Sequence, residues 1–244
     1  YWLSESAFSA FSAPKLYDIG ITRRGLQTGS KDKYIRLWHE CSLGAIEIDR
    51  LTKKQVTESK KKWFLFNNGG DFRKWYGNLD LIVEWEKDGL ALKSFEGAII
   101  PSESLYFEEG ICWPRLGSGL AGFRLHPKGF IPGDLSPCFY SEQNNIAVMA
   151  YLNSKVSHYF LNAINPTLTM PVGDMAKIPF MEVFDIDSAE ENARKLLDIH
   201  KSDWNDLEVS FDFKKPPIQT IDHAGSTLKA TYRNLRNHQC KIII

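Results

Sequence analysis

One stretch of the chain brings cations, amides and large aromatic rings close together. Residues 60–80 read KKKWFLFNNGGDFRKWYGNLD. Lysine and arginine contact phosphates, whereas amides and planar rings contact base edges and faces, so this composition is typical of a nucleic-acid-binding surface. Glycine and asparagine also tolerate positive φ, so an ordinary hairpin with a solvated tip at residues 67–70 is the alternative interpretation.

A glycine-rich loop at residues 20–29, which reads GITRRGLQTG, is the second candidate surface. We expect its cations and the lysines at residues 60–62 to neutralise DNA phosphates and to give salt-dependent binding. Side-chain amides are able to pair with adenine edges, and Arg73 with guanine. For each residue taken singly, a solvent-facing role is the alternative. The predicted DNA-binding residues are Arg23, Arg24, Gln27, Thr28, Lys31, Lys33, Lys60, Lys61, Lys62, Asn67, Asn68, Arg73, Lys74, Trp75 and Tyr76.

Three short motifs resemble enzymatic ones, and each is incomplete. Residues 117–122 (GSGLAG) match a dinucleotide-binding pattern, but Pro114 precedes them in place of a buried strand and Pro127 follows before a helix could develop. Residues 165–168 (NPTL) resemble the Asn-Pro-Pro-aromatic motif of adenine N6-methyltransferases without the ring that stacks a flipped base. Residues 212–214 (DFK) lack an evident partner acid for a metal-dependent nuclease. We therefore predict no catalytic, cofactor-binding or metal-ligating residue in this chain.

The composition is that of a globular protein with local rather than global charge. The chain has 244 residues, 43% of them apolar and 25% charged, and its net charge is zero. Residues 53–74 hold seven Lys or Arg against two acids, and residues 182–208 hold nine acids against three Lys or Arg. A basic patch beside an acidic helix is compatible with a site-specific DNA reader and equally with many enzymes.

Cysteine spacing and hydropathy indicate the cellular compartment in which the protein is expected to work. The four cysteines at positions 41, 112, 138 and 240 form no CxxC pair, which favours reduced thiols in a cytoplasmic protein. The longest apolar run, residues 146–152, is too short to span a bilayer, so no membrane partner is expected. The first residue is Tyr, and we expect the chain to be an excised piece of a longer protein.

Hydrophobic patterning predicts an α+β (mixed) fold. Strands are expected at residues 34–39 and 45–48, and at residues 63–66 paired antiparallel with residues 81–85. Short apolar runs continue to residue 132, which indicates a twisted, mainly antiparallel sheet with packed helices. Helical spacing predicts helices at residues 143–163, at 188–208 after a capping box, and at 226–239. We expect residues 1–180 to form one domain and residues 181–244 a helical, spacer-like segment.

An ordered series of short segments resembles the PglX-type adenine-specific DNA methyltransferases of BREX phage-defence systems. The series runs through most of the chain: GLQTG at 25–29, YIRLW at 34–38, KW at 62–63, GG at 69–70, FRKWYGN at 72–78, GICW at 110–113, PKGF at 127–130, LNSK at 152–155, NPTL at 165–168, VGD at 172–174 and SFDF at 210–213.

The resemblance implies a place in a larger enzyme. The matched region of that family follows the catalytic domain and looks like the target-recognition domain of related type IIG enzymes and of type I specificity subunits, often with a long helix after it. It implies double-stranded DNA as partner, an own or associated catalytic domain that uses S-adenosylmethionine, and further defence-system subunits. No cofactor is expected in this chain, because the catalytic and cofactor motifs are missing.

Two other functions remain open at this level. The acidic helix with Trp204 could dock the catalytic domain or another subunit, which would make the chain a protein-interaction module. A self-contained nuclease would require metal-dependent cleavage that is lost on Asp212→Ala.

Overall fold

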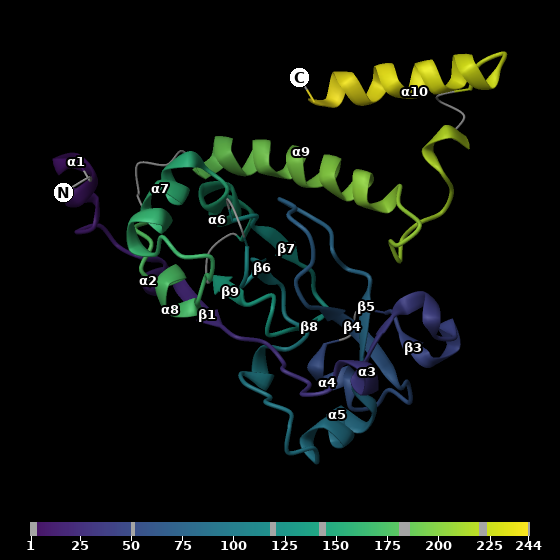
Figure 1. Ribbon diagram of the computed structural model, residues 1–244, viewed down its shortest axis with the longest axis horizontal. Helices are drawn as coiled ribbons and strands as arrows, with labels where there is room; N and C mark the ends of the chain where they lie inside the picture. Colours follow the sequence, from purple (N-terminus) through teal and green to yellow (C-terminus); the bar gives the residue numbers. More distant parts are fainter. Residues whose placement is uncertain are drawn as a thin grey trace.

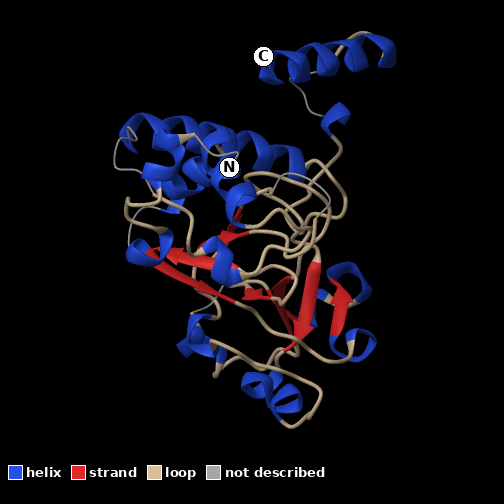
Figure 2. Ribbon diagram, turned by 60° about the vertical axis from the view of Figure 1, so that its left-hand side comes forward, coloured by secondary structure: helices blue, strands red, loops and turns tan. Residues whose placement is uncertain are grey.

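The computed structural model describes residues 4–49, 52–117, 121–141, 145–180, 186–219 and 224–243. Two β-sheets lie at the centre of the body, and a layer of helices that includes α6, α7 and α9 covers one side of it (Figures 1 and 2). The combination of helices with antiparallel and mixed sheets confirms the α+β class. No helix in the described ranges is long and apolar enough to cross a membrane.

The first sheet is antiparallel and carries the larger core. Its strand order is β1 (Gly20–Arg23), β9 (Cys138–Ser141), β6 (Gly110–Cys112) and β7 (Arg124–His126). Trp113, Phe123 and Phe139 from and beside these strands are buried against the helical layer. That layer consists of α6 (Asn145–Leu152), α7 (Lys155–Ile164) and part of α9 (Ile186–Asn205), with the short helices α1 (Glu5–Ala10), α2 (Leu16–Ile19) and α8 (Val172–Met175) at its end.

The second sheet is mixed and is built around β4 (Trp63–Asn67), all of whose residues are buried. β5 (Leu81–Glu84) pairs antiparallel with it, with Phe66 opposite Leu81, which confirms the pairing predicted from the sequence. β3 (Ile46–Glu47) and β8 (Ile131–Pro132) pair parallel with successive parts of β4, and β2 (Ile35–Leu37) extends the sheet beyond β5. The structure therefore has two sheets, one of them with parallel pairs, where the sequence suggested a single meander.

Alternation along β4 separates two further cores. Phe64 and Phe66 pack on one face with Trp85, whereas Trp63 and Leu65 face Trp204 on the other. Short helices line the first of these cores: α3 (Lys31–Tyr34), α4 (Lys53–Val56) and α5 (Glu86–Lys93).

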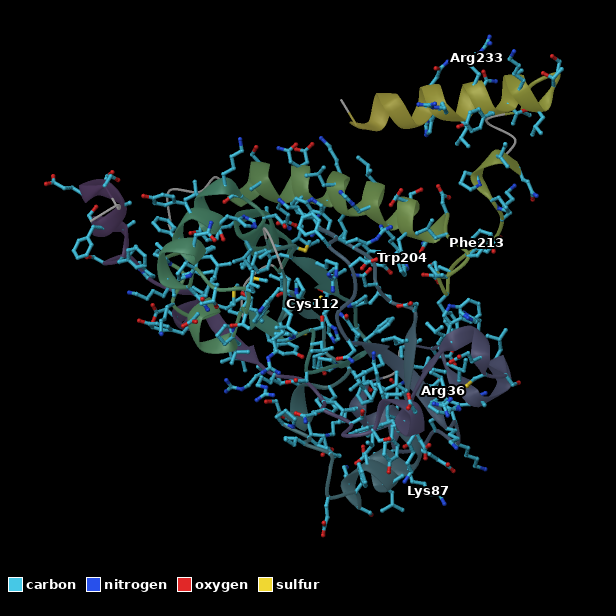
Figure 3. The ribbon with its side chains drawn as sticks, in the orientation of Figure 1. Arg36, Lys87, Cys112, Trp204, Phe213 and Arg233 are labelled. Atoms are coloured by element: carbon cyan, nitrogen blue, oxygen red, sulfur yellow. The ribbon has the colours of Figure 1, made fainter. Side chains whose placement is uncertain are left out.

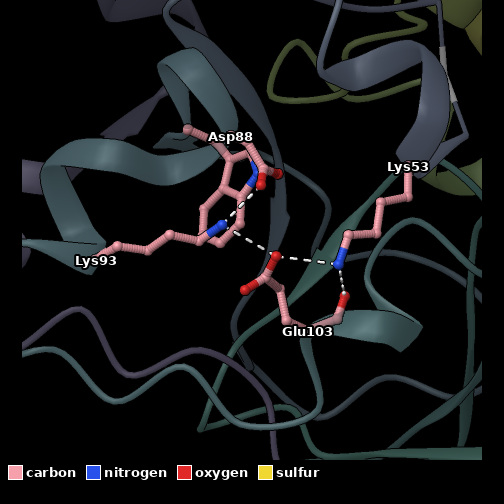
Figure 4. A network of polar contacts seen from close by, with 5 residues as sticks. Lys53, Asp88, Lys93 and Glu103 are labelled. Carbon is pink, nitrogen blue, oxygen red and sulfur yellow. Dashed lines mark hydrogen bonds and ion pairs between the residues drawn. The ribbon is translucent and has the colours of Figure 1, made fainter.

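An ion-pair network joins α4 and α5 to the turn η3 (Glu103–Leu105), as Figure 4 shows. The Glu103 carboxylate accepts from Lys53 Nζ at 3.0 Å and from Lys93 Nζ at 3.1 Å, and Lys93 also pairs with Asp88 at 2.7 Å. One of the basic residues in the patch at residues 53–74 is thus committed to holding the fold together.

The predicted helix at residues 143–163 is in fact two helices. α6 ends at Leu152 and α7 begins at Lys155, while residue 143 lies outside the described residues. Ser154 caps α7 by accepting from Ser157 N, and its extended backbone breaks the helical run. Asn153 is held by Phe123, whose backbone N–H donates to Asn153 Oδ1 and whose carbonyl accepts from Nδ2.

Two later helices differ slightly from the predicted bounds. α9 already includes Ile186, so Ser188 lies inside the helix and not at its N-cap, and the helix ends at Asn205 instead of residue 208. The closing helix α10 (Leu228–Ile243) runs longer than predicted and stands apart from the body in both views (Figures 1 and 2).

Candidate nucleic-acid interface

The two glycine-rich segments singled out in the sequence meet across one cleft. Gln27 and Thr28 come from the loop after β1, Lys31 is the first residue of α3, and Asn68 directly follows β4. The cleft has a volume of about 200 Å³. We call it the Gln27–Asn68 cleft; it is lined by Leu26, Gln27, Thr28, Gly29, Ser30, Lys31, Ile35, Asn68, Asp134 and Leu135.

The wall of the cleft formed by residues 26–31 is fixed by close approaches of its backbone to neighbouring segments. A Cβ on Gly25 would lie 2.2 Å from the Pro132 carbonyl oxygen, and one on Gly29, where φ is +69°, would lie 2.1 Å from the Gly97 oxygen. Gln27 and Ile99 exchange backbone hydrogen bonds at 3.0 and 2.8 Å. The backbone of Gln27 is therefore tied down, which leaves its half-buried side chain beside the opening.

The two neighbouring asparagines of the second wall have different environments. Asn68 lines the cleft, and its Oδ1 accepts from Leu135 N at 3.2 Å. Asn67 is fully buried, where its Nδ2 lies 3.0 Å from His126 Nδ1 and 3.3 Å from Cys112 Sγ. In this arrangement Asn67 cannot present its amide to a base, and Asn68 is the member of the pair that can.

Arginines concentrate at the rim around one carboxylate. Arg24 donates from Nε and Nη2 to Asp134 Oδ1 at 2.8 and 2.6 Å, and Arg115 donates from Nη1 to Oδ2. Arg23 and Lys31 are exposed close by in sequence. Asp134 thus pairs with two arginines, and Lys31 lines the same cleft. Neither Arg115 nor Asp134 was singled out in the sequence, because their partners lie 19 and 110 residues away and no local pattern marks them.

Lys33 and the three lysines at residues 60–62 do not line the Gln27–Asn68 cleft. Lys33 Nζ lies 4.8 Å from the Tyr34 ring centroid and 5.4 Å from that of Phe95. Lys60 is exposed, Lys61 Nζ donates to the Gly44 carbonyl at 2.6 Å, and Lys62 Nζ lies 3.4 Å from Glu84. These three lysines precede β4 and Asn68 follows it, which places Lys62, the nearest of them in sequence, about 20 Å from Asn68 at about 3.3 Å per residue.

Residues 73–78 pack against the last turn of α9. Arg73 Nη1 pairs with Asp203 at 3.0 Å, and its guanidinium lies 5.0 Å from the Trp204 ring centroid. Trp204, labelled in Figure 3, comes from the last turn of α9. A Cβ on Gly77, where φ is +121°, would lie 3.0 Å from the same indole.

The neighbours of Arg73 are also used inside the fold. Lys74 Nζ donates to the Asn153 carbonyl at 3.2 Å, and burial lowers the pKa of this ammonium. Trp75 and Tyr76 are both buried, and Trp75 N donates to the Phe123 carbonyl at 2.8 Å. Residues 75–79 of the connection between β4 and β5 therefore pack inward, whereas residues 70–72 are exposed at its tip.

The remaining sequence motifs have structural roles or lie elsewhere. Asn165 Oδ1 accepts from Thr167 N at 2.9 Å, and its Nδ2 donates to Asp174 at 2.8 Å, so this side chain organises a turn. Asp212 and Lys214 line a separate cleft of about 580 Å³ beside the end of α9. Within the described ranges, no group of three or more His, Cys, Asp or Glu could hold a metal ion. Residues 118–120 of the GSGLAG segment lie outside the described residues.

The amino-acid sequence is similar to those of two known methyltransferases. The chain is 32% identical over 248 residues to the adenine-specific methyltransferase BrxX of Escherichia coli O9:H4 (strain HS), which covers 99% of this chain. It is 29% identical over 247 residues, 96% of its length, to the adenine-specific methyltransferase PglX of Lacticaseibacillus casei (strain Zhang). These similarities support a relation to BREX-type methyltransferases. The chain spans only 19% and 20% of these relatives, and no family model matches it.

Proposed function

We propose that this chain is the DNA-recognition part of a site-specific adenine-N6 DNA methyltransferase of phage defence. The observation that carries the proposal is the Gln27–Asn68 cleft, where side-chain amides from two distant segments meet beside Lys31. The similarity to adenine-specific methyltransferases along nearly the whole chain supports a role within such an enzyme.

The cleft offers two kinds of contact to duplex DNA. Gln27 and Asn68 carry amides with a donor and an acceptor side by side, which suits the N6 and N7 positions of adenine in the major groove. Arg23, Lys31 and the rim arginines supply phosphate contacts that set register without reading sequence. Asp134 keeps the rim arginines apart and in place through its two carboxylate oxygens.

The methyl transfer itself would belong to another part of the enzyme. S-adenosylmethionine would bind a catalytic domain that flips the adenine out of the duplex, while this chain positions the duplex next to it. Partners of the proposed domain are therefore double-stranded DNA, the catalytic domain and other subunits of the defence system.

The test is selection of bound sequences from a random duplex library across a salt series. We expect one short motif to be enriched and the logarithm of affinity to fall linearly with the logarithm of salt, by about 0.9 per phosphate contact. Gln27→Ala and Asn68→Asp should remove enrichment at one or two positions and keep the salt slope. Asn68→Asp should keep the local fold, because the new carboxylate still accepts from Leu135 N. Arg23→Glu with Lys31→Glu should weaken all sequences alike.

Lys155→Glu, an exposed change on α7, is the matched control and should leave both readouts unchanged. Loss of binding in that variant equal to the loss in the Arg23 and Lys31 variant would show that only bulk charge matters. Absence of binding by the parent even at low salt would contradict the proposal and favour the protein-interaction module.

A further inference from the structure

α9 and α10 each leave an apolar stripe uncovered. On α9, Leu196 and Ile199 are one turn apart and 38% and 37% exposed. On α10, Leu228 and Tyr232 are 74% and 53% exposed, again one turn apart. A 16-residue helix is marginal in water without a packed face, so the α10 stripe needs a partner surface.

The inner face of α9 is already occupied, which fixes where its free stripe points. Ala193 and Trp204 are buried against the body, with Leu197 partly buried between them. At about 100° per residue, Leu196 lies on the flank of this buried face, and Ile199 lies farther round the helix toward solvent. In both views α10 lies on the side of α9 that is turned away from the sheets (Figures 1 and 2).

The charges of the two helices are complementary. α10 contains no acidic residue, and the exposed Lys229, Arg233 and Arg236 form a row beside its apolar stripe. On α9, the exposed Asp198 is next to Ile199 in the sequence, and Asp203, which is also exposed, lies one turn beyond Ile199 and pairs with Arg73 of the body. In Figure 3 the side chain of the labelled Arg233 lies on the side of α10 that is turned away from α9 and the body.

The connection between the helices favours pairing within one chain. α9 ends at Asn205 and α10 begins at Leu228, and the two helices already run in opposite directions in Figure 1. A tether of this length keeps the partner at a high effective concentration. Antiparallel packing of α10 on α9 would bury both stripes and bring the cationic row to the acids.

We propose that α10 docks on the outer face of α9 in the same chain, as an antiparallel helix pair held by Leu196, Ile199, Leu228 and Tyr232. The pairing is independent of DNA binding, and it would turn the end of the chain into a two-helix arm with few free apolar side chains. The proposed α9–α10 contact includes no residue of the two sheets and none of the Gln27–Asn68 cleft.

Hydrogen exchange of the α10 backbone amides tests this docking. We expect slow exchange in the parent that does not depend on protein concentration, and exchange on the order of tenfold faster in the Leu196→Asp, Ile199→Asp double variant. Tyr232→Asp should have the same effect from the other side of the interface. Exchange of the β4 amides should stay unchanged in every variant, because these four side chains are not part of the buried cores.

Matched controls separate docking from a general effect of added carboxylates. Val156→Asp on α7 and Asn237→Asp, opposite the apolar stripe of α10, should leave α10 exchange as in the parent. Fast α10 exchange in the parent, or equal exchange in the parent and the double variant, would overturn the proposal. Protection that increases with protein concentration would assign the stripe to a second copy and would also overturn it.

Discussion

His126 is held neutral by its position between the two sheets. It is fully buried, with Nδ1 facing the Asn67 amide and Nε2 near the Phe130 carbonyl at 3.3 Å. Burial lowers the pKa of this imidazole to about 4, with the Phe130 hydrogen bond acting in the opposite direction. In the unfolded chain the same group titrates near its ordinary value of about 6.5. Between these values the unfolded chain binds a proton that the folded protein does not.

We therefore expect acid to destabilise the protein through His126. The folded-state pKa is depressed, so the contribution is complete above pH 6.5 and is lost as the pH falls toward 4. Between pH 7 and pH 5 the free energy of unfolding should fall by about 2 kcal/mol from this group. Urea titrations of the parent and of His126→Asn at the two pH values measure it, with the exposed His39→Asn as control. An equal pH dependence in parent and His126→Asn would contradict this assignment.

Asn67 and Asn68 show which features of the candidate site could be predicted from the sequence and which could not. Residue type and turn propensity identified Asn68 and Gln27, and the structure brings both to one cleft. The same reasoning included Asn67, Trp75 and Tyr76, which are buried. Every residue of β4 is buried, so no alternation marks Asn67 as an interior residue. The partners that bury it, Cys112 and His126, are 45 and 59 residues away.

At the scale of elements, the segment at residues 73–78 ties several parts of the molecule to α9. Arg73 contacts the end of α9, Lys74 reaches the junction of α6 and α7, and Trp75 bridges to β7. The cations beside aromatics that suggested base stacking are thus used in cation–π and ion-pair contacts within the fold. Sequence could not reveal this, because Asp203 lies 130 residues from Arg73.

We expect Gly77→Ala to destabilise the contact between residues 73–78 and α9. The added Cβ would meet Arg73 Cδ at 2.8 Å and Trp204 at 3.0 Å, at a φ that L side chains rarely adopt. The free energy of unfolding should fall by about 1–3 kcal/mol. Gly173→Ala in α8, where nothing lies within 4 Å of the new Cβ, should be neutral or slightly stabilising in the same denaturation experiment. Equal losses in both variants would show that the Arg73 and Trp204 contacts do not matter.

The break between α6 and α7 supports a second prediction about elements. Ser154→Ala removes the side-chain acceptor for Ser157 N and should lower the free energy of unfolding by about 1 kcal/mol. Ser202→Ala, at an exposed position in the last turn of α9, should have little effect in the same thermal or urea titration. The break was missed in the sequence because apolar spacing continues across it, although Ser154 followed by a polar first turn is an N-cap signal.

At the scale of the whole molecule, charge is clustered locally and there is no net charge. The net charge is zero, yet Arg24 and Arg115 pair with Asp134 beside the cleft that Lys31 also lines. The α+β class and the β4–β5 pairing were predictable, since apolar patterning encodes them locally. The division into two sheets was not, because β8 crosses from its sequence neighbours in the first sheet to pair with β4 in the second.

If the cleft reads DNA, its sequence preference should move with this chain when it is exchanged between related enzymes. The region can be replaced in the Escherichia coli methyltransferase BrxX, whose matching segment is 32% identical over 99% of this chain. We expect the adenine motif methylated by the chimera, mapped by modified-base sequencing, to change from that of the parent to a new one. The further variants Gln27→Ala and Asn68→Asp in the chimera should relax one or two positions of the new motif, each at a cost of about 1–3 kcal/mol of discrimination. A chimera that methylates the original motif would place base reading outside this chain and would leave its cleft a role in positioning alone.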